Sequence, residues 1–455
     1  MSFSVQGKRV VVVGAGRSGR AAADLLAERG AHVTLTDVLP VAGAAEYVAR
    51  GIAIETGPHR ADLFMTADLV VLSPGVPPAQ PAIQAARLAG VPVIGEVELA
   101  SRWLSGRVVA ITGTKGKSTT STLTSRILQQ GGFDAPAGGN LGTALSGQVA
   151  GSTASTLHVV EVSSFQLEMT DTFHPWISVL LNISPDHLDR HASIDEYAAA
   201  KARVFANQTD EDWAVINADD PAALALARNG RARRLDFALD ANVTDGVTVQ
   251  GGDIVRRTGA RVMPLVPLSS VKLPGRHLLA DVLAAVAVGS VAGVAPAAMR
   301  GAVEGFAGLE HALERVAEIG GVRFVNDSKA TNIASARRAL ESFEGGVVVI
   351  LGGRFKGGRF EDLRDVVRAR ATGVIAIGEA APLVRQALED LVPVEDAGSM
   401  PEAVVQAAAL ARPGGVVLLA PACSSFDMFA DYADRGRKFK EAVAALGTRR
   451  EVRTN

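Results

Sequence analysis

The stretch RVVAITGTKGKSTT, residues 107–120, decides how the middle of this chain folds. An apolar run typical of a β-strand ends in a glycine-rich turn, and a helical segment predicted from Ser118 to about Gln130 follows it. Backbone N–H groups of such a turn and the positive end of the next helix attract an anion. The pattern predicts a phosphate-binding loop that consists of Gly113, Thr114, Lys115, Gly116, Lys117, Ser118 and Thr119.

Two side chains of this loop are predicted to have specific roles in binding a nucleotide and its metal ion. Lys117 is expected to meet the β- and γ-phosphates of a nucleotide, and Ser118 to hold Mg²⁺. Ile111 stands where the usual pattern has its first glycine, so the loop is a shorter variant of that pattern. A surface turn without a ligand is the alternative, but the strand before the loop and the helix after it favour the phosphate loop.

Composition narrows the class of protein. The chain has 455 residues, a formal net charge of −2 and a single cysteine, Cys423. Such a length predicts about three domains. The charge balance argues against nucleic acid or an anionic membrane as a partner, and one cysteine excludes an internal disulfide framework. No secretory signal is visible, and the uncharged run 282–299 is expected to hold a buried helix that ends near Gly289–Gly293 rather than a membrane span, which predicts a soluble protein. The single cysteine suits a reducing compartment, so the protein is predicted to be cytoplasmic.

A second glycine-rich turn, Gly14 to Gly19, lies near the N-terminus between an apolar run and a helical segment. The next apolar run ends in Asp37, close to the place where an acid meets a ribose in dinucleotide-binding units. Taken alone, this βαβ pattern of the predicted domain 1–95 suggests NAD. A different diphosphate ligand or a purely structural turn remains open at this point.

Two further domains are predicted, 96–307 and 308–455. In the second domain, apolar runs deliver Glu161, and then Asp186 and His187, at their C-terminal ends, as expected for central parallel strands that meet at one site. The third domain has strand runs at 347–351, 374–377 and 416–419, separated by helical stretches. The fold class is therefore α/β with three domains.

The order of these motifs resembles that of the Mur ligases, and specifically of the glutamate-adding branch of that family. The resemblance implies a Rossmann-like N-terminal domain, a central P-loop ATPase-like domain with a parallel sheet, and a Rossmann-like C-terminal domain. The motifs that carry it span all three predicted domains: Gly113 to Thr119, Gly139 to Gly142, Glu161 to Glu168, Asp186 to Arg190, Asn326 to Asn332 and Pro421 to Ser425.

The resemblance implies a monomeric enzyme of peptidoglycan precursor synthesis. Such an enzyme uses ATP and two Mg²⁺ ions to join D-glutamate to UDP-N-acetylmuramoyl-L-alanine through an acyl phosphate, releasing ADP and phosphate. A related ligase for L-glutamate or a folylpolyglutamate-type substrate is the alternative within the class. An NAD-dependent oxidoreductase or sensor, or a nucleotide switch without catalysis, is the alternative from another class.

Catalytic roles carried over by the resemblance fall on Lys117, Asn140, Glu161, His187 and Lys201. Glu161 and Ser118 match positions at one Mg²⁺ ion, His187 matches a position at the second, and Lys201 matches a lysine carried as a carbamate that supports the metal. From the residues alone, Lys201 is a solvent-facing helix lysine, Asn140 a turn asparagine and His187 a structural residue, because Mg²⁺ prefers oxygen ligands.

Substrate contacts are implied in the outer domains as well. The UDP-sugar is expected at Ser18, Asp37, Ser73 and Gly75, and the acyl-phosphate end of the substrate at Asn140. Asp327 matches a contact on the adenosine side of ATP. The positions expected around the incoming glutamate are Lys329, Thr331, Lys356, Ser425 and Phe426.

Three regions of the chain depart from the family pattern. Ala312 stands where an arginine usually meets ATP, and Arg315 is expected to take over that role. Leu278 and Asp281 stand where asparagines are typical, and Val38-Leu39 follow Asp37 where an arginine is common. Nucleotide contacts outside the phosphate loop are therefore expected to differ from those of the family. Cys423 is expected to be a packed small residue rather than a nucleophile.

Overall fold

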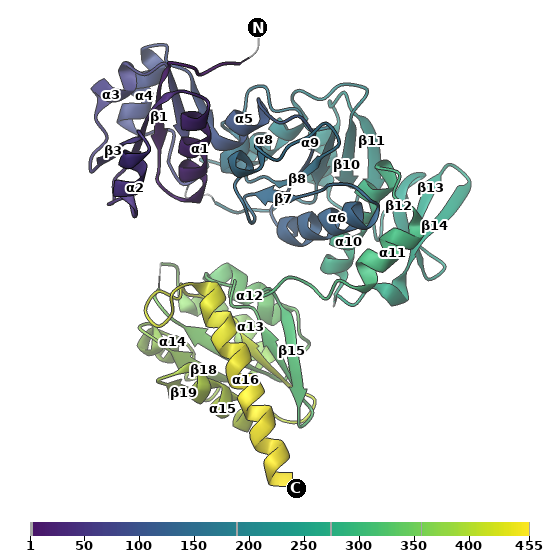
Figure 1. The fold of residues 1–455 in the computed structure, drawn as a ribbon. Helices are drawn as coiled ribbons and strands as arrows, with labels where there is room; N and C mark the ends of the chain where they lie inside the picture. Colours follow the sequence, from purple (N-terminus) through teal and green to yellow (C-terminus); the bar gives the residue numbers. More distant parts are fainter. Residues whose placement is uncertain (1–2, 188–189, 274, 356, 455) are drawn as a thin grey trace. The chain divides into compact units, whose positions relative to one another are not determined.

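The stretch of residues 107–120 folds into the predicted strand, turn and helix. Strand β6 (Arg107–Thr112) runs into the glycine-rich turn, and helix α6 (Lys117–Gln130) begins one residue earlier than predicted. The structure is a computed structural model that describes residues 3–187, 190–273, 275–355 and 357–454 (Figure 1). It divides into two compact units, Met1–Phe306 and Ala307–Asn455, which together contain three sheets.

The first sheet has five parallel strands in the order β3-β2-β1-β4-β5. Val10 and Val12 of β1 face helices α1 and α2, while Val11 and Val13 face α3 and α4, so both faces are covered as a parallel sheet requires. The elements are β1 (Arg9–Val13), α1 (Arg17–Glu28), β2 (His32–Asp37), α2 (Ala44–Ala49), β3 (Ala53–Thr56), α3 (Ala61–Met65), β4 (Leu69–Leu72), α4 (Pro81–Leu88), β5 (Val93–Gly95) and α5 (Glu96–Ser101).

The second sheet of the first unit has nine strands in the order β14-β13-β12-β11-β10-β9-β6-β8-β7. Its pairs are parallel from β7 to β12, and β12 to β14 form an antiparallel meander whose first turn lies at Gly251–Gly252. Strands β6, β8 and β9 lie side by side, so their C-terminal ends share one edge of the sheet.

The other elements of this region are β7 (Ala137–Gly139), η1 (Leu145–Gln148), β8 (Leu157–Glu161), α7 (Ser164–Leu167), β9 (Ile177–Leu180), α8 (Ile194–Ala202), η2 (Arg203–Phe205), β10 (Trp213–Asn217), α9 (Pro221–Ala227), β11 (Arg233–Phe237), β12 (Asp245–Gln250), β13 (Asp253–Thr258), β14 (Arg261–Pro267), η3 (Leu268–Ser270), α10 (Arg276–Val291) and α11 (Pro296–Glu304). Helix α10 is buried from Asp281 to Gly289, as predicted for the uncharged run. In the described part of the chain, no helix is long and apolar enough to cross a membrane.

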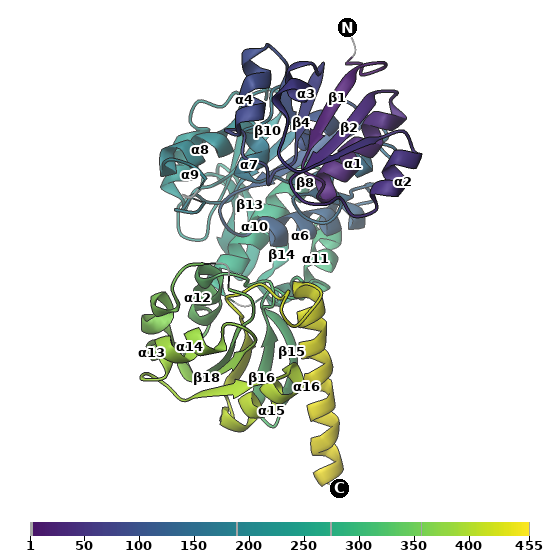
Figure 2. The ribbon, with the colours of Figure 1, turned by 90° about the vertical axis from the view of Figure 1, so that its left-hand side faces the viewer.

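The second unit contains a six-stranded sheet in the order β15-β16-β20-β17-β18-β19, parallel except for the edge strand β15. Helices α12, α13 and α14 cover one face, and α15 and α16 cover the other (Figure 2). The elements are β15 (Glu314–Ile319), β16 (Val322–Asn326), α12 (Ile333–Glu341), β17 (Val347–Gly352), η4 (Phe360–Leu363), α13 (Arg364–Arg370), β18 (Ala371–Ile377), α14 (Ala381–Leu388), β19 (Val394–Ala397), α15 (Met400–Leu410), β20 (Val416–Leu419) and α16 (Tyr432–Thr454).

The predicted α/β class is thus confirmed, with three sheets that are mainly parallel. Each sheet gathers polar loops at the C-terminal ends of its parallel strands, which is where ligands of such sheets bind. The domain boundaries 95/96 and 307/308 stay a prediction.

Candidate active site

The phosphate loop closes around the side chain of Lys117. Its Nζ donates to the carbonyl oxygens of Gly113 and Thr114, at 2.9 Å each. Gly113 and Gly116 have φ angles of +152° and +83°, a region that L side chains rarely adopt. A Cβ at Gly116 would also lie 2.1 Å from Oδ1 of Asp281. The loop therefore needs glycine at both positions, and its lysine stands at the N-terminus of α6, where the helix dipole favours an anion.

Asn182, just after β9, forms hydrogen bonds to the other side of the phosphate loop. Its Oδ1 accepts from the backbone N–H of Lys115 at 2.8 Å, and its Nδ2 donates to the Lys115 oxygen at 3.1 Å. The Thr114 N–H bonds to the Asn182 carbonyl at 2.9 Å. Asn182 could not be identified from sequence, because its role depends on β9 lying beside β6.

Lys201 lies inside the protein rather than in solvent. Its side chain in α8 is 1% exposed, and its Nζ donates to the Gly113 oxygen at 2.9 Å. The reading of Lys201 as a solvent-facing lysine is therefore wrong. Burial and, second, the nearby charge of Lys117 lower the pKa of Lys201 to about 7. A considerable fraction of this amine is consequently uncharged near neutral pH.

Tyr197 connects Lys201 to the phosphate loop. The Lys201 Nζ lies 4.6 Å from the centre of the Tyr197 ring, and the Tyr197 hydroxyl donates to Thr114 Oγ1 at 3.0 Å. Burial raises the pKa of Tyr197 to about 12, so the hydroxyl keeps its proton. Tyr197 was missed from sequence, although its spacing of four residues from Lys201 puts both on one helix face.

Glu161 and Asn140 meet at the C-terminal edge of the same sheet. Asn140 Nδ2 donates to Glu161 Oε1 at 2.6 Å, and the Asn140 N–H bonds to the Glu161 carbonyl at 2.9 Å. Glu161 is 2% exposed, and its Oε2 is buried without a hydrogen-bond partner among the residues that the structure describes. A buried carboxylate oxygen of this kind is costly unless a cation meets it. The donor set of Glu161 and the Ser118 hydroxyl suits Mg²⁺, which prefers oxygen ligands.

His187 lies in the loop after β9, exposed and with a φ of +54°. Its ring centre is 4.9 Å from that of Phe165 and 6.5 Å from that of Tyr197, whose other neighbour is Lys201. The structure therefore gathers His187, Lys201 and the phosphate loop around Tyr197. A backbone in the left-handed region at a histidine fits a functional constraint at this position.

In the N-terminal sheet, the glycine-rich turn is packed against the loop after β4. Ser73 Oγ donates to the Gly14 oxygen at 2.8 Å, and a Cβ at Gly19 would lie 1.8 Å from that same oxygen. Both Asp37 oxygens already accept backbone hydrogen bonds, from Ala15 at 2.7 Å and from Leu39 at 3.0 Å. Asp37 therefore shapes the turn itself.

Two other predicted residues of this domain lie close to that turn. Ser18 is in the first turn of α1, and Gly75 lies two residues beyond Ser73. The side chain of Arg17 donates to the Asn140 carbonyl at 3.3 Å. The glycine-rich turn and Asn140 are thus neighbours, an arrangement that the sequence could not show.

Asp281, one of the residues expected to differ from the family pattern, places its carboxylate against the phosphate loop. Burial raises the pKa of Asp281 to about 7. This side chain touches the loop at Gly116 from helix α10, so part of the population keeps it neutral at physiological pH. Leu278, one turn earlier in α10, is partly buried.

In the second unit, the predicted residues lie in loops after β16 and β20. Asp327 Oδ1 accepts from the Leu313 N–H at 3.2 Å, and burial raises the pKa of Asp327 to about 7. Lys329 is exposed and Thr331 half-buried in the same loop, and the other loop carries Ser425, buried, and Phe426, exposed. Lys356 lies outside the described residues.

Two further expectations concern this unit. Arg315, expected to replace the missing arginine at Ala312, pairs with Glu318 at 2.8 Å on strand β15. Cys423 is buried as predicted, and burial raises the pKa of its thiol to about 12, so it is no nucleophile at neutral pH.

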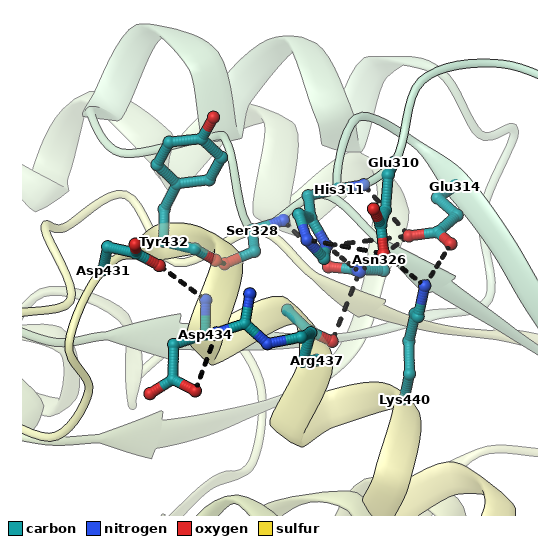
Figure 3. Close-up of polar contacts among 11 residues, drawn as sticks. Glu310, His311, Glu314, Asn326, Ser328, Asp431, Tyr432, Asp434, Arg437 and Lys440 are labelled. Atoms are coloured by element: carbon teal, nitrogen blue, oxygen red, sulfur yellow. Dashed lines mark hydrogen bonds and ion pairs between the residues drawn. The ribbon is translucent and has the colours of Figure 1, made fainter. Parts of the chain in front are cut away.

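A group of possible metal ligands that the sequence had not suggested consists of Glu310, His311 and Glu314. Figure 3 shows that the side chain of Lys440 reaches this group from α16. Its Nζ lies 2.7 Å from Glu310 Oε1 and 2.9 Å from Glu314 Oε1. The lysine ammonium bridges the two carboxylates and balances one of their two negative charges, so the contacts of this cluster are those of an ionic network within the protein.

Comparison with known protein families matches three family models in chain order. They are the N-terminal domain of MurD-like Mur ligases at residues 8–95, the Mur ligase middle domain at residues 111–289, and the Mur ligase glutamate ligase domain at residues 313–423. The middle-domain match begins at Ile111, within the last two residues of β6, and it covers the phosphate loop, Glu161, His187 and Lys201.

Similar full-length proteins carry one name. A UDP-N-acetylmuramoylalanine–D-glutamate ligase of Acidobacterium capsulatum is 46% identical over 449 residues, which are 97% of each chain. One of Koribacter versatilis is 44% identical over 448 residues, 98% of this chain and 99% of that one. The UDP-N-acetylmuramate-alanine ligase MurC of Thermotoga maritima shares the fold, with a TM-score of 0.60 at 20% identity over 96% of this chain and all of that chain. The chain belongs to the Mur ligase family.

Proposed function

We propose that this protein joins D-glutamate to UDP-N-acetylmuramoyl-L-alanine at the expense of ATP, in the synthesis of peptidoglycan precursors. The observation that carries the proposal is the cluster at the C-terminal edge of β6, β8 and β9. There a phosphate loop with Lys117 at its centre lies beside the buried Lys201, and Glu161 presents a carboxylate oxygen that has no hydrogen-bond partner in the described part of the chain. Full-length relatives at 40–46% identity with this activity in their names support it.

The reaction proceeds in two steps. An oxygen of the alanyl carboxylate attacks the γ-phosphorus of ATP, the bond from that phosphorus to the β,γ-bridging oxygen breaks, and ADP leaves. The amine of glutamate then attacks the acyl carbon, phosphate departs with the oxygen that came from the carboxylate, and the amine releases its proton. Little covalent help from protein is required, so positioning and neutralisation of charge dominate. Lys117 and the loop N–H groups supply positive charge to the phosphates of ATP.

The residues fit the requirement for Mg²⁺. Glu161, through its unpartnered Oε2, and the Ser118 hydroxyl would hold one ion, while His187 and a modified Lys201 would hold a second. Mg²⁺ in such a site neutralises the phosphate oxygens during transfer. Asn140 keeps Glu161 in place through their 2.6 Å hydrogen bond.

Lys201 is proposed to react with carbon dioxide. Its lowered pKa leaves a neutral amine whose nitrogen can form a bond to the carbon of CO₂, and the nitrogen loses one proton. The product is a carbamate, an anion with two oxygens. Conversion of a cation into an anion removes the repulsion between Lys201 and Lys117 and creates an oxygen ligand for a metal.

The remaining substrate contacts are assigned residue by residue. The UDP-sugar is proposed to bind at Ser18, Ser73 and Gly75 around the Gly14–Gly19 turn, with Asp37 holding that turn in shape. Asp327 is proposed on the adenosine side of ATP, and the glutamate at Lys329, Thr331, Lys356, Ser425 and Phe426. We further propose that the enzyme acts as a monomer in the cytoplasm, where its nucleotide substrates are made.

An omission assay tests the function. Phosphate release from ATP is measured with both UDP-N-acetylmuramoyl-L-alanine and D-glutamate, with each omitted in turn, and with L-glutamate in place of D-glutamate. We expect sustained release only with the complete D-glutamate mixture. Release that ignores the UDP-sugar would refute the proposal, and equal rates with L-glutamate would refute its stereochemistry. A thermal shift with NAD but none with the UDP-sugar would favour an NAD-binding protein instead.

A further inference from the structure

Arg435 is a fully buried guanidinium at the start of helix α16. Its side chain is 0% exposed and makes three hydrogen bonds. Nε donates to Ser328 Oγ at 2.9 Å, Nη2 to the Ser328 carbonyl at 2.9 Å, and Nη1 to the Cys423 carbonyl at 3.0 Å. All three acceptors are uncharged oxygens, so these bonds do not neutralise the charge.

Among the described residues these hydrogen bonds go to neutral oxygens, and the charge of the nearby Asp427 carboxylate offsets only part of the effect of burial on the guanidinium. Burying a charge in this way is expensive. Burial lowers the pKa of Arg435 to about 10, which still leaves the guanidinium charged at neutral pH. An apolar side chain would fill this space at a smaller cost in solvation. The N–H donors of the planar guanidinium must therefore contribute something that apolar packing cannot. The residues that accept these hydrogen bonds show what this contribution is.

The acceptors belong to the two loops that carry the proposed substrate contacts. Ser328 stands between Asp327 and Lys329, and Cys423 stands two residues before Ser425. The two loops also touch directly, because the Ala422 N–H bonds to the Ala330 carbonyl at 2.9 Å. Arg435 thus joins the loop after β16 to the loop after β20.

A third loop and a strained residue show how closely this junction is packed. A Cβ at Gly353, after β17, would lie 3.3 Å from Nη1 of Arg435 and 2.4 Å from the Ser424 oxygen. Ala422 has a φ of +60°, which costs energy for a residue with a Cβ and persists only where the surroundings enforce it.

Neighbouring groups of α16 hold the same loop by its backbone and short side chains. In Figure 3, Ser328 points toward Tyr432, whose carbonyl accepts from Ser328 Oγ at 2.7 Å. The Gly436 carbonyl accepts from Asn326 Nδ2 at 3.4 Å. The first turns of α16 therefore hold the loop after β16 in position, and Arg435 is the charged residue among these contacts.

We propose that Arg435 is a positioning residue for glutamate: through Ser328 and Cys423 it sets the distance between Lys329 in one loop and Ser425 in the other. This inference rests on the proposed function, because the two loops matter as a pair only if they bind one substrate. Arg435 touches no substrate itself. A misplacement of about 1 Å at a reacting group can cost roughly 100-fold in rate, so the position of the loops is worth a buried charge.

Matched variants test the proposal in the full-length protein. Arg435→Lys keeps the positive charge but loses the branched set of N–H donors that reaches both loops. Ser328→Ala removes one of the oxygens that accept from these donors. Arg437→Lys is the control on the same helix, because Arg437 is exposed and bonds to Asp434 at 3.2 Å. For each variant, kcat and the KM for D-glutamate, ATP and the UDP-sugar are measured at a temperature where circular dichroism shows the protein folded.

We expect Arg435→Lys to raise the KM for D-glutamate about tenfold or more, with the KM for the UDP-sugar within twofold of wild type. Ser328→Ala should have a smaller effect, and the double variant should show less than the product of the two single effects, because both remove one interaction. The Arg437→Lys control should match wild type.

Two results would overturn the proposal. One is a KM for D-glutamate within twofold of wild type in Arg435→Lys, and the other is an equal rise in all three KM values, which marks a general structural role. Wild-type protein that fails to ligate in the same assay refutes the proposed function instead. If Arg435→Lys does not fold, the Ser328→Ala variant decides by the same criterion: a selective rise in the KM for D-glutamate supports the proposal, and no rise overturns it.

Discussion

Lys117 and Lys201 donate hydrogen bonds to the same backbone oxygen, that of Gly113, each at 2.9 Å. They come from different helices, α6 and α8, and meet where β6 ends. Burial disfavours the charged form of Lys201, and repulsion from the Lys117 ammonium adds to this effect, so the pKa of Lys201 falls to about 7. Negative charge from nucleotide phosphates, or from a carbamate on Lys201, would reduce this repulsion. The two lysines therefore form the electropositive centre of the site.

Replacing Lys117 by Ala should abolish ligation. The change removes both hydrogen bonds that close the loop and the charge that meets the phosphates. We expect kcat to fall by at least about 10³-fold, the upper end of the cost of losing one preorganised donor, because the change also removes the contacts that close the loop. Steady-state phosphate release measures it. Lys272→Ala, at an exposed lysine, is the control. Turnover retained in Lys117→Ala would contradict the catalytic role of the loop.

Lys201 should take up carbon dioxide in a pH-dependent way. The neutral amine is the reactive form, so the carbamate fraction should rise as the pH increases through about 7 at a fixed concentration of dissolved CO₂. Carbon-13 NMR of protein equilibrated with labelled CO₂ should show a carbamate carbonyl signal. The signal should vanish in Lys201→Met, and ligase activity should fall with it. A fully active wild type without the signal would argue against the carbamate.

Glu161→Gln should weaken the response to Mg²⁺. The substitution keeps the shape of the side chain and the acceptor for Asn140, but it removes the negative charge at the unpartnered Oε2. We expect the Mg²⁺ concentration for half-maximal activity to rise about tenfold or more, and kcat to fall at saturating Mg²⁺. Titration of activity against Mg²⁺ measures this. The exposed Glu211→Gln provides the baseline, and an unchanged Mg²⁺ requirement would exclude Glu161 as a ligand.

Asp281→Asn should stabilise the protein, and more so at high pH. Burial raises the pKa of Asp281 from 3.8 to about 7, so the folded state binds more protons than the unfolded state between these values. Its favourable contribution is complete below about pH 4 and is lost as the pH rises through 7. At pH 8 the variant should gain up to about 4 kcal/mol over wild type, and at pH 4 much less.

Thermal melts of apo protein at the two pH values measure this difference, and the exposed Asp171→Asn is the control. A gain that is equal at pH 4 and pH 8 would show that Asp281 does not titrate in this range. The same variant introduces the asparagine that the resemblance to the Mur ligases led us to expect at this position, so its nucleotide affinity should also be at least as high as that of wild type.

Much of the central site could be predicted from local sequence. The strand, turn and helix at residues 107–130 follow from an apolar run, two glycines and a helical segment, because these features act over a few residues. The convergence of Glu161 and His187 on the loop follows from the shared edge of parallel strands. The third sheet was predicted only in part. Three of its strands, β15, β16 and β19, carry charged residues that interrupt the apolar pattern.

What could not be predicted depends on contacts between distant segments. Lys201 sits in an alanine-rich helical stretch, and nothing local shows that tertiary packing buries it. The approach of Asp281 to Gly116 and the bond from Arg17 to Asn140 arise only when helices pack on the sheets. The fork of Arg435 was missed for the same reason, since its acceptors lie in two separate loops.

The central claim is that a carboxylate, and not water, takes the γ-phosphoryl group held by the loop at Gly113–Ser118. The most direct test uses UDP-N-acetylmuramoyl-L-alanine labelled with oxygen-18 in both oxygens of its alanyl carboxylate, in unlabelled water with ATP and D-glutamate. The phosphate released is then examined by mass spectrometry. We predict one labelled oxygen in each phosphate, since the acyl phosphate breaks between carbon and oxygen. Phosphate without label, formed at the rate of ligation, would contradict the account.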